Sequence, residues 1–186
     1  MDPTHRALWA QPNGLGDLGE LMARWLEGSI SYQPADGGTE PDPETAHLVP
    51  VLAAANRAGL VTHFSQPGVP LVDGSGQRAA VLGFCSEDTA IGLQEVSTGT
   101  ELVLLTYAPG ATSDAQVVVT LDVGTEFTFV GAPTDTANID HYYADDLSAQ
   151  GLAALHDAWQ ICLFDPRWGC DDLLWDTLGT WIREER

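Results

Sequence analysis

The sequence contains no lysine, and its 7 basic residues, all arginine, stand against 27 acidic ones. The formal net charge is −20 at pH 7. Because an acidic surface repels phosphate backbones, direct nucleic-acid binding is not expected, whereas solubility and cationic partners are favoured. Two further interpretations stay open: the surface imitates double-stranded DNA, as in a phage counter-defence protein, or it reflects a GC-rich or halophilic source.

Cysteine is scarce as well. Cys85, Cys162 and Cys170 form an odd set without CxxC spacing, which predicts free thiols in a reducing cytoplasm. The first residues are polar, no apolar segment follows them, and no apolar run approaches the roughly 18 residues of a membrane span. The sequence therefore predicts a cytoplasmic protein without a membrane partner.

Motifs of known mechanism are missing. Residues 74–76 (Gly-Ser-Gly) lack the lysine of a P-loop, and neither GxGxxG after a strand nor GxSxG occurs. Residues 140–146 mix Asp and His, but without a recognisable ligand spacing. No cofactor and no metal are expected, and whether the protein is an enzyme stays open.

The periodicity of the 186 residues predicts a single α+β domain. Helices are expected from Asp17 to Gly28, and from Asp42 to Gly59 with a bend at Pro50. Strands are expected at residues 60–65, 79–84, 101–107, 115–121 and 125–130, with a helix from Ser86 to about Val96 between the second and third. This order predicts a mixed, mostly antiparallel sheet of about five strands with helices packed on it. A split β-α-β arrangement is a variant that fits the same order.

Around this core, residues 1–14 are predicted to form a loose lead-in anchored by Trp9, and residues 15–145 form the α+β core. Residues 131–146 show no periodicity and are expected to form either a functional loop or a loop packed by its pair of tyrosines. Residues 146–186 are expected to form a pair of helices, the first with Trp159 and Cys162 on its apolar face.

The end of the first strand is the preferred ligand site. Residues 63–68 place a hydroxyl, an amide and free backbone groups at a sheet edge, although a simple terminating turn is an alternative. The residues expected to line a polar pocket there are Asn56, His63, Ser65, Gln66 and Tyr142. The expected partner is a small polar or cationic ligand, a peptide, or a basic protein.

Cys85 supports a second hypothesis, a small thiol-dependent enzyme with His63, His141 or His156 as its base. A helix N-terminus follows Cys85 and would lower the pKa of the thiol, but two acidic residues in the first turn oppose this. The alternative is a buried, unreactive cysteine.

Two stretches carry a family resemblance. The first combines Trp9 and residues 25–28 with Leu48 and residues 56–68; the second runs from Trp159 through residues 165–169 to Trp175. Together they resemble an uncharacterised domain family of Streptomyces-type actinobacteria and their phages. The resemblance spans most of the chain and implies a source, but no activity and no catalytic residues.

Overall fold

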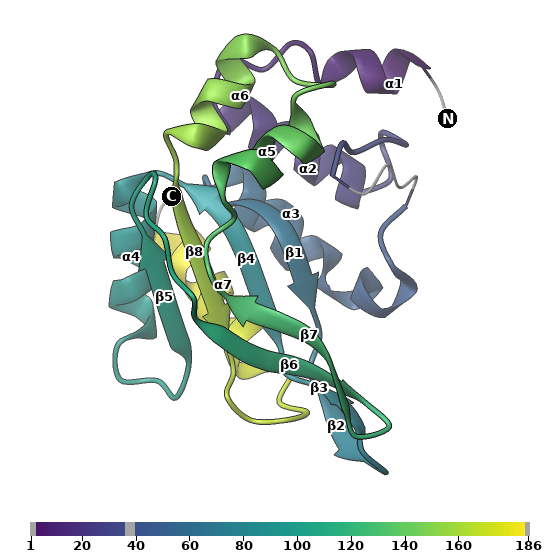
Figure 1. The fold of residues 1–186 in the computed structure, drawn as a ribbon, viewed down its shortest axis with the longest axis vertical. Coiled ribbons are helices and arrows are strands. Elements are labelled where there is room, and N and C mark those ends of the chain that lie inside the picture. Colours follow the sequence, from purple (N-terminus) through teal and green to yellow (C-terminus); the bar gives the residue numbers. More distant parts are fainter. Residues whose placement is uncertain (1–2, 36–39, 185–186) are drawn as a thin grey trace.

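The computed structural model describes residues 3–35 and 40–184, and Figure 1 shows how their helices and strands are arranged. The α-helices are α1 (Pro3–Leu8), α2 (Leu15–Leu26), α3 (Val49–Arg57), α4 (Glu87–Ser97), α5 (Thr136–Tyr143), α6 (Ala149–His156) and α7 (Leu173–Glu184), and η1 (Pro43–Leu48) is a 3-10 helix. The strands are β1 (Val61–Gln66), β2 (Val69–Val72), β3 (Ser75–Gln77), β4 (Ala80–Cys85), β5 (Val103–Tyr107), β6 (Gln116–Asp122), β7 (Thr125–Gly131) and β8 (Trp159–Phe164).

The strands of the described residues form two four-stranded sheets. Sheet A has the order β1-β4-β8-β5 and sheet B the order β2-β3-β6-β7. Helices α2, α3, α4 and α7 lie on one side of sheet A, and β6 and β7 cross its other side (Figure 1). The chain thus forms three layers: helices, sheet A and sheet B.

Two apolar clusters hold these layers together, and β8 contributes to both because side chains alternate along a strand. Ile161 and Leu163 belong to the cluster on the helical side of sheet A. Cys162 and Phe164 belong to the smaller cluster with Val119 and Val130 of sheet B. With both faces buried, β8 is the central strand of the fold.

The predicted α+β class is confirmed, but the sheet differs from the one expected. All described strand pairs are antiparallel, and there are eight strands in place of about five. The expectation of a mixed sheet came from the strand–helix–strand step of β4, α4 and β5. That step is present, but β8 lies between β4 and β5 and is antiparallel to both, which is the split β-α-β arrangement.

The predicted C-terminal pair of helices is wrong in one element. The first helix ends at His156, and the residues from Trp159 to Phe164 form β8. Leu155, Trp159 and Cys162 have helical spacing, which produced the error. The segment Trp-Gln-Ile-Cys-Leu-Phe is instead an aromatic and apolar run typical of a strand buried on both faces.

Local boundaries also need correction. Helix α2 begins at Leu15, not Asp17, whose carboxylate accepts a 2.9 Å hydrogen bond from the backbone of Asn13. The predicted lead-in contains α1, and the predicted loop at 131–146 contains α5, capped by Asp135. Trp9 is confirmed as an anchor, since its side chain is 1% exposed.

The residues from Asp42 to Gly59 fold in two steps. Residues Pro43–Leu48 form the 3-10 helix η1, and α3 starts at Val49 with Pro50 in its first turn. A proline in the first turn forfeits no intrahelical hydrogen bond, because the amide groups there have no partner within the helix. Pro50 therefore marks the change of helix type in place of the expected bend.

Candidate functional site

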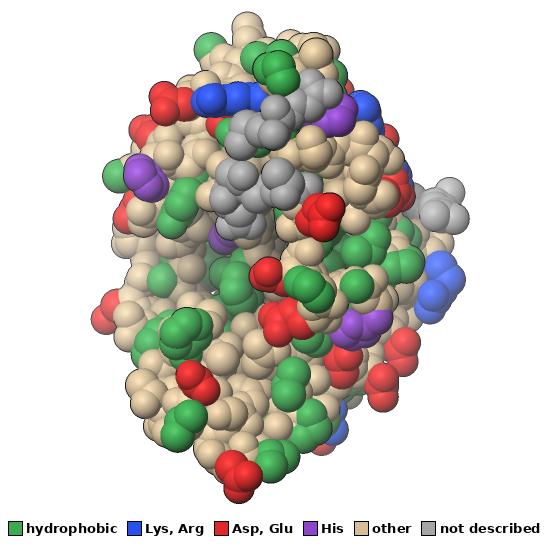
Figure 2. Space-filling model, turned by 90° about the vertical axis from the view of Figure 1, so that its right-hand side faces the viewer, with side chains coloured by type: hydrophobic (Ala, Val, Ile, Leu, Met, Phe, Trp, Pro, Cys, Tyr) green, Lys and Arg blue, Asp and Glu red, His purple; other side chains and the backbone are tan. Residues whose placement is uncertain are grey.

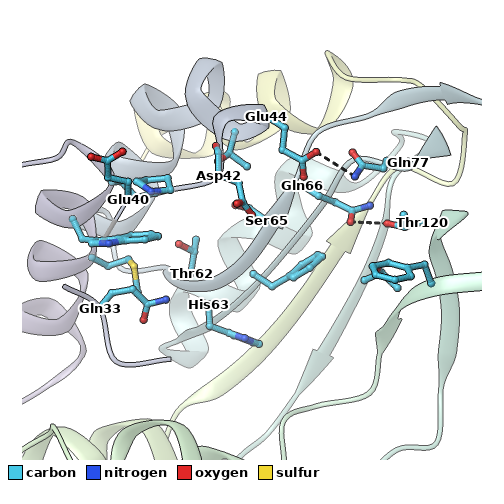
Figure 3. Close-up of a pocket in the computed structure, with 18 residues that line it drawn as sticks. Gln33, Glu40, Asp42, Glu44, Thr62, His63, Ser65, Gln66, Gln77 and Thr120 are labelled. Carbon is cyan, nitrogen blue, oxygen red and sulfur yellow. Dashed lines mark hydrogen bonds between the residues drawn. The ribbon is translucent and has the colours of Figure 1, made fainter. Parts of the chain in front are cut away.

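A cleft of about 440 Å³ runs beside β1, and we call it the β1 cleft. Figure 2 shows the molecule hollowed on the face turned toward the viewer, and Figure 3 shows the cleft in detail. Its walls come from four places: the end of α2, the segment that leads into η1, strand β1, and strands β3, β6 and β7 of sheet B. The lining residues are Met22, Trp25, Leu26, Gln33, Glu40, Pro41, Asp42, Glu44, Thr45, Thr62, His63, Phe64, Ser65, Gln66, Gln77, Thr120, Phe127 and Thr128.

The position of β1 explains why this cleft exists. β1 is the edge strand of sheet A, and β4 is its only strand partner among the described residues. The consecutive residues 62–66 all line the cleft. Because neighbouring side chains in a strand point to opposite faces, a cleft that touches each of them must run along the edge of the strand.

His63 lies at an irregularity in β1. Thr62 pairs with Gly83 and Phe64 with Leu82, so His63 is an extra residue without a partner in β4. This bulge places the imidazole 5.1 Å from the ring of Phe84, measured between centroids. Burial lowers the pKa of His63 to about 4, so the ring is neutral at pH 7.

Asn56 was predicted to be a ligand residue, but the structure gives it a bracing role. Its side chain is 0% exposed and is not part of the cleft wall. Nδ2 donates to the carbonyl of Leu52 and to the hydroxyl of Thr62, and Oδ1 accepts from the backbone amide of Thr62. Asn56 therefore fixes the start of β1 against α3.

Gln66 is in the cleft wall as predicted, yet its polar atoms are already engaged. Nε2 donates to the carbonyls of Arg78 and Val119, at 2.7 and 3.0 Å. Oε1 accepts from the hydroxyl of Thr120 (Figure 3). Gln66 ties sheet A to sheet B, whereas Ser65 beside it is partly exposed in the cleft.

Three carboxylates line the cleft that the sequence prediction did not include. Glu40, Asp42 and Glu44 lie along one side, from Gln33 at one end to Gln77 at the other (Figure 3). No arginine or lysine occurs among the described lining residues. In the sequence these residues are visible only as a group of nearby acidic residues in a loop. Nothing in that pattern indicates that the loop faces β1.

Trp25, in the α2 wall, has an unsatisfied donor. The side chain is 8% exposed, and its indole Nε1 has no hydrogen-bond partner within the described parts of the chain. Leaving a buried donor unpaired costs roughly 1–3 kcal/mol.

Tyr142 belongs to a second cavity of about 380 Å³, which we call the aromatic pocket. It lies between sheet A, β7 and α5, and most of the residues that line it are apolar or aromatic. The residues that line it are Ala35, His63, Phe64, Leu82, Phe84, Thr128, Phe129, Val130, Ala132, Pro133, Thr134, Asn138, Tyr142 and Tyr143. His63, Phe64 and Thr128 line both cavities, so the two are contiguous.

Cys85 does not have the environment that nucleophilic catalysis requires. The side chain is 0% exposed, and burial raises the pKa of the thiol to about 12. The lowered pKa expected from the following helix is thus reversed, because desolvation of the thiolate outweighs the helix dipole. Cys85 lines neither the β1 cleft nor the aromatic pocket, and it does not join His63 in a common cavity.

Other chemical groups of the described chain do not gather into a site. His156 pairs with Asp140 at 2.9 Å, and neither residue lines the β1 cleft. Within residues 3–35 and 40–184, no three His, Cys, Asp or Glu side chains are placed to hold a metal ion. None of the described helices has the length and apolar character needed to span a membrane.

Comparison with known proteins places the chain in a family but gives no activity. No curated protein matches it. A family model described as a domain of unknown function (DUF6919) matches residues 4–184, which includes every element that forms the β1 cleft. The chain therefore belongs to the DUF6919 family.

Proposed function

We propose that this protein is a binding module whose β1 cleft takes a cationic group, either a small polar cation or a basic side chain of a partner. The observation that carries the proposal is the row formed by Glu40, Asp42 and Glu44 on one wall of an open cleft. A row of carboxylates inside a recess attracts a cation more strongly than the same charges spread over a convex surface.

Three of the described arginines form ion pairs away from the cleft. Arg57 pairs with Glu20 and Glu27, Arg6 with Asp146, and Arg167 with Asp165 and Glu101. No such partner faces the carboxylates of the cleft among the described residues. The one ionisable nitrogen base in the lining, His63, is neutral at pH 7 because burial lowers its pKa to about 4. The charge of the cleft is therefore available to a ligand.

The remaining walls also suit a cation. Trp25, Phe64 and Phe127 contribute aromatic rings, and an ammonium or guanidinium over such a ring gains about 0.5–2 kcal/mol. The Ser65 hydroxyl adds a polar group to the β1 wall, and it has no hydrogen-bond partner within the described residues. Carboxylates with aromatic walls would favour a guanidinium, which both hydrogen-bonds in a plane and stacks.

Two other functions have less support. On the face shown in Figure 2, acidic side chains outside the cleft lie among neutral and apolar ones, and no row of them extends across the face as a phosphate backbone would. The thiol-enzyme hypothesis would require an accessible thiolate, and Cys85 is fully buried.

The test compares two ligands of similar shape, argininamide and the uncharged citrullinamide. Calorimetry and thermal-shift measurements should detect binding of argininamide. The affinity for citrullinamide should be at least tenfold lower. A cleft triple variant, Glu40→Gln/Asp42→Asn/Glu44→Gln, should lose about tenfold or more in argininamide affinity, equivalent to about 1.4 kcal/mol.

The matched control is a remote triple variant, Glu95→Gln/Asp114→Asn/Asp157→Asn, which removes the same charge from exposed positions outside the cleft. It should bind argininamide as the unmodified protein does. Equal losses in both triple variants would mean that only the net charge attracts the ligand, and the proposal would be wrong.

A further inference from the structure

We propose that the natural occupant is an extended peptide that adds as a new strand to the open edge of β1, with basic side chains toward the carboxylates and apolar ones toward the aromatic pocket. This inference rests on the proposed function and specifies its ligand. Three observations carry it: the open edge, the two chemically different sides of that edge, and the continuity of the two cavities.

The edge of β1 is open over residues 63–66. Alternate backbone amides and carbonyls of an edge strand point away from its neighbour, and within the described chain no backbone group beyond β4 pairs with them. The amide of Thr62 is different, because Asn56 accepts from it at 2.9 Å. The Asn56 side chain thus occupies the first outward backbone amide of β1, and the outward backbone groups of residues 63–66 stay available for pairing.

The bulge at His63 is one feature that hinders strand addition. Two other such features, a proline and a covering strand, are absent from β1 within the described residues. The other outer strand on this side of the molecule, β2, contains Pro70, whereas β1 contains neither proline nor lysine. The residues leading into η1 stand beside β1, but none of the described ones forms a backbone hydrogen bond to it. The edge is recessed in a cleft, which admits one chain and hinders pairing between two whole proteins.

The two sides of the edge differ in chemistry. Glu40, Asp42 and Glu44 lie on the side of the helical layer, and Phe127 and Phe129 of β7 lie on the side of sheet B. Because side chains of a strand alternate between faces, a peptide paired with β1 would direct every second residue to the acids and the others to the aromatic side. The expected recognition pattern is therefore basic and apolar residues in alternation.

The length of the occupant follows from the cleft. The open residues 63–66 extend over roughly 10 Å at about 3.3 Å per residue, so about four peptide residues can pair with them. At the His63 end the cleft continues into the aromatic pocket through His63, Phe64 and Thr128. An apolar side chain near that end of the peptide would enter the pocket, whose wall includes Phe129 and Tyr142.

The probe for the test is an acetylated and amidated hexapeptide, Arg-Val-Arg-Phe-Arg-Val. Its control is the block isomer Arg-Arg-Arg-Val-Phe-Val, which has the same composition without the alternation. The alternating peptide should bind at least tenfold more tightly than both the block isomer and argininamide. Affinity is measured by calorimetry at the same salt concentration, since the charge of the two peptides is identical.

N-methylation tests the backbone pairing directly. In a strand, only alternate amides face the partner, so methylating the three arginine amides or the three apolar amides removes different bonds. One of these two peptides should lose at least tenfold in affinity, and the other should bind nearly as before. Equal affinities of the two methylated peptides would overturn strand addition. A peptide held only by its side chains would not distinguish between the two sets of backbone amides.

The aromatic pocket is tested with Phe129→Ala/Tyr142→Ala, whose side chains are 45% and 46% exposed and therefore tolerate truncation. Affinity for the phenylalanine peptide should fall several-fold, and affinity for a version with threonine in its place should not. If argininamide binding depends on the cleft carboxylates but the alternating hexapeptide binds no better than the block isomer, only this inference fails. If argininamide binding does not depend on them, the proposed function fails.

Discussion

At the scale of single residues, the bulge at His63 separates the side chains of β1 into different roles. Thr62 turns to Asn56, and Gln66 turns to sheet B. His63 packs against Phe84 and is lifted out of the pairing with β4. The imidazole thereby becomes a shared wall of the β1 cleft and the aromatic pocket.

His63 should give the protein a measurable sensitivity to acid. Its pKa is about 4 in the folded chain and near its ordinary 6.5 in the unfolded chain, so between these values the unfolded state binds more protons. Stability therefore rises with pH over this window, and the contribution is lost as the pH falls from about 6.5 toward 4. His63→Gln should reduce the loss of unfolding free energy between pH 7 and pH 4.5 by about 2 kcal/mol.

Urea unfolding of both proteins at a series of pH values measures this difference. Carboxylates titrate in the same range, but they are common to the two proteins and cancel in the comparison. Parallel pH curves for the unmodified protein and His63→Gln would show that the imidazole accepts its proton as readily in the folded chain as in water.

At the scale of elements, Gln66 is the polar connection between the two sheets. It satisfies the carbonyls of Arg78 and Val119 and receives the hydroxyl of Thr120. Gln66→Met keeps the size of the side chain but leaves these groups without a partner, which should destabilise the fold by about 2–3 kcal/mol. Chemical denaturation gives the free energy of unfolding.

Ser65→Ala is the matched control, because Ser65 is the preceding residue of the same strand and faces the open cleft. A change at such a site should stay within about 0.5 kcal/mol. A Gln66→Met variant as stable as Ser65→Ala would mean that water replaces the amide and that apolar packing alone holds the sheets together.

Local signals predicted much of the elements correctly. Ser86, which precedes two acidic residues, predicted the start of α4, and its side chain accepts a hydrogen bond from the backbone amide of Thr89. The strand order could not be predicted from the sequence, since β8 comes from a distant part of the chain and lies between β4 and β5. Its sequence fits a helical stripe and a buried strand equally well, and only tertiary packing decides between them.

Some residues of the candidate site could be predicted from the sequence, and others could not. His63, Ser65 and Gln66 were placed in one cleft by their neighbourhood in β1. Tyr142 lies in the adjoining pocket, and Asn56 proved to be a brace. The carboxylates of residues 40–44 could not be assigned from sequence, because a loop carries no periodicity that fixes which element it faces.

At the scale of the whole molecule, the charge of −20 is a cost to the folded state. Compaction brings the carboxylates closer together, and only a few of them have an arginine or histidine partner among the described residues. The unpaired charges of the β1 cleft add to this cost, so a cationic occupant would relieve a repulsion as well as form new contacts.

Salt should therefore stabilise the protein even without a ligand. Raising NaCl from 10 to 300 mM shortens the screening length from about 30 Å to roughly 6 Å, which should increase the unfolding free energy by on the order of 1 kcal/mol through weaker repulsion. The cleft and remote triple variants both have a net charge of −17, from −20 plus three, and should show smaller and similar increases. Urea unfolding at each salt concentration provides the measurement, with equal osmolality of sucrose as the control for solvent effects. A decrease in stability with salt would mean that the ion pairs of the few arginines outweigh the excess of carboxylates, and that the acidic cleft is not under electrostatic strain.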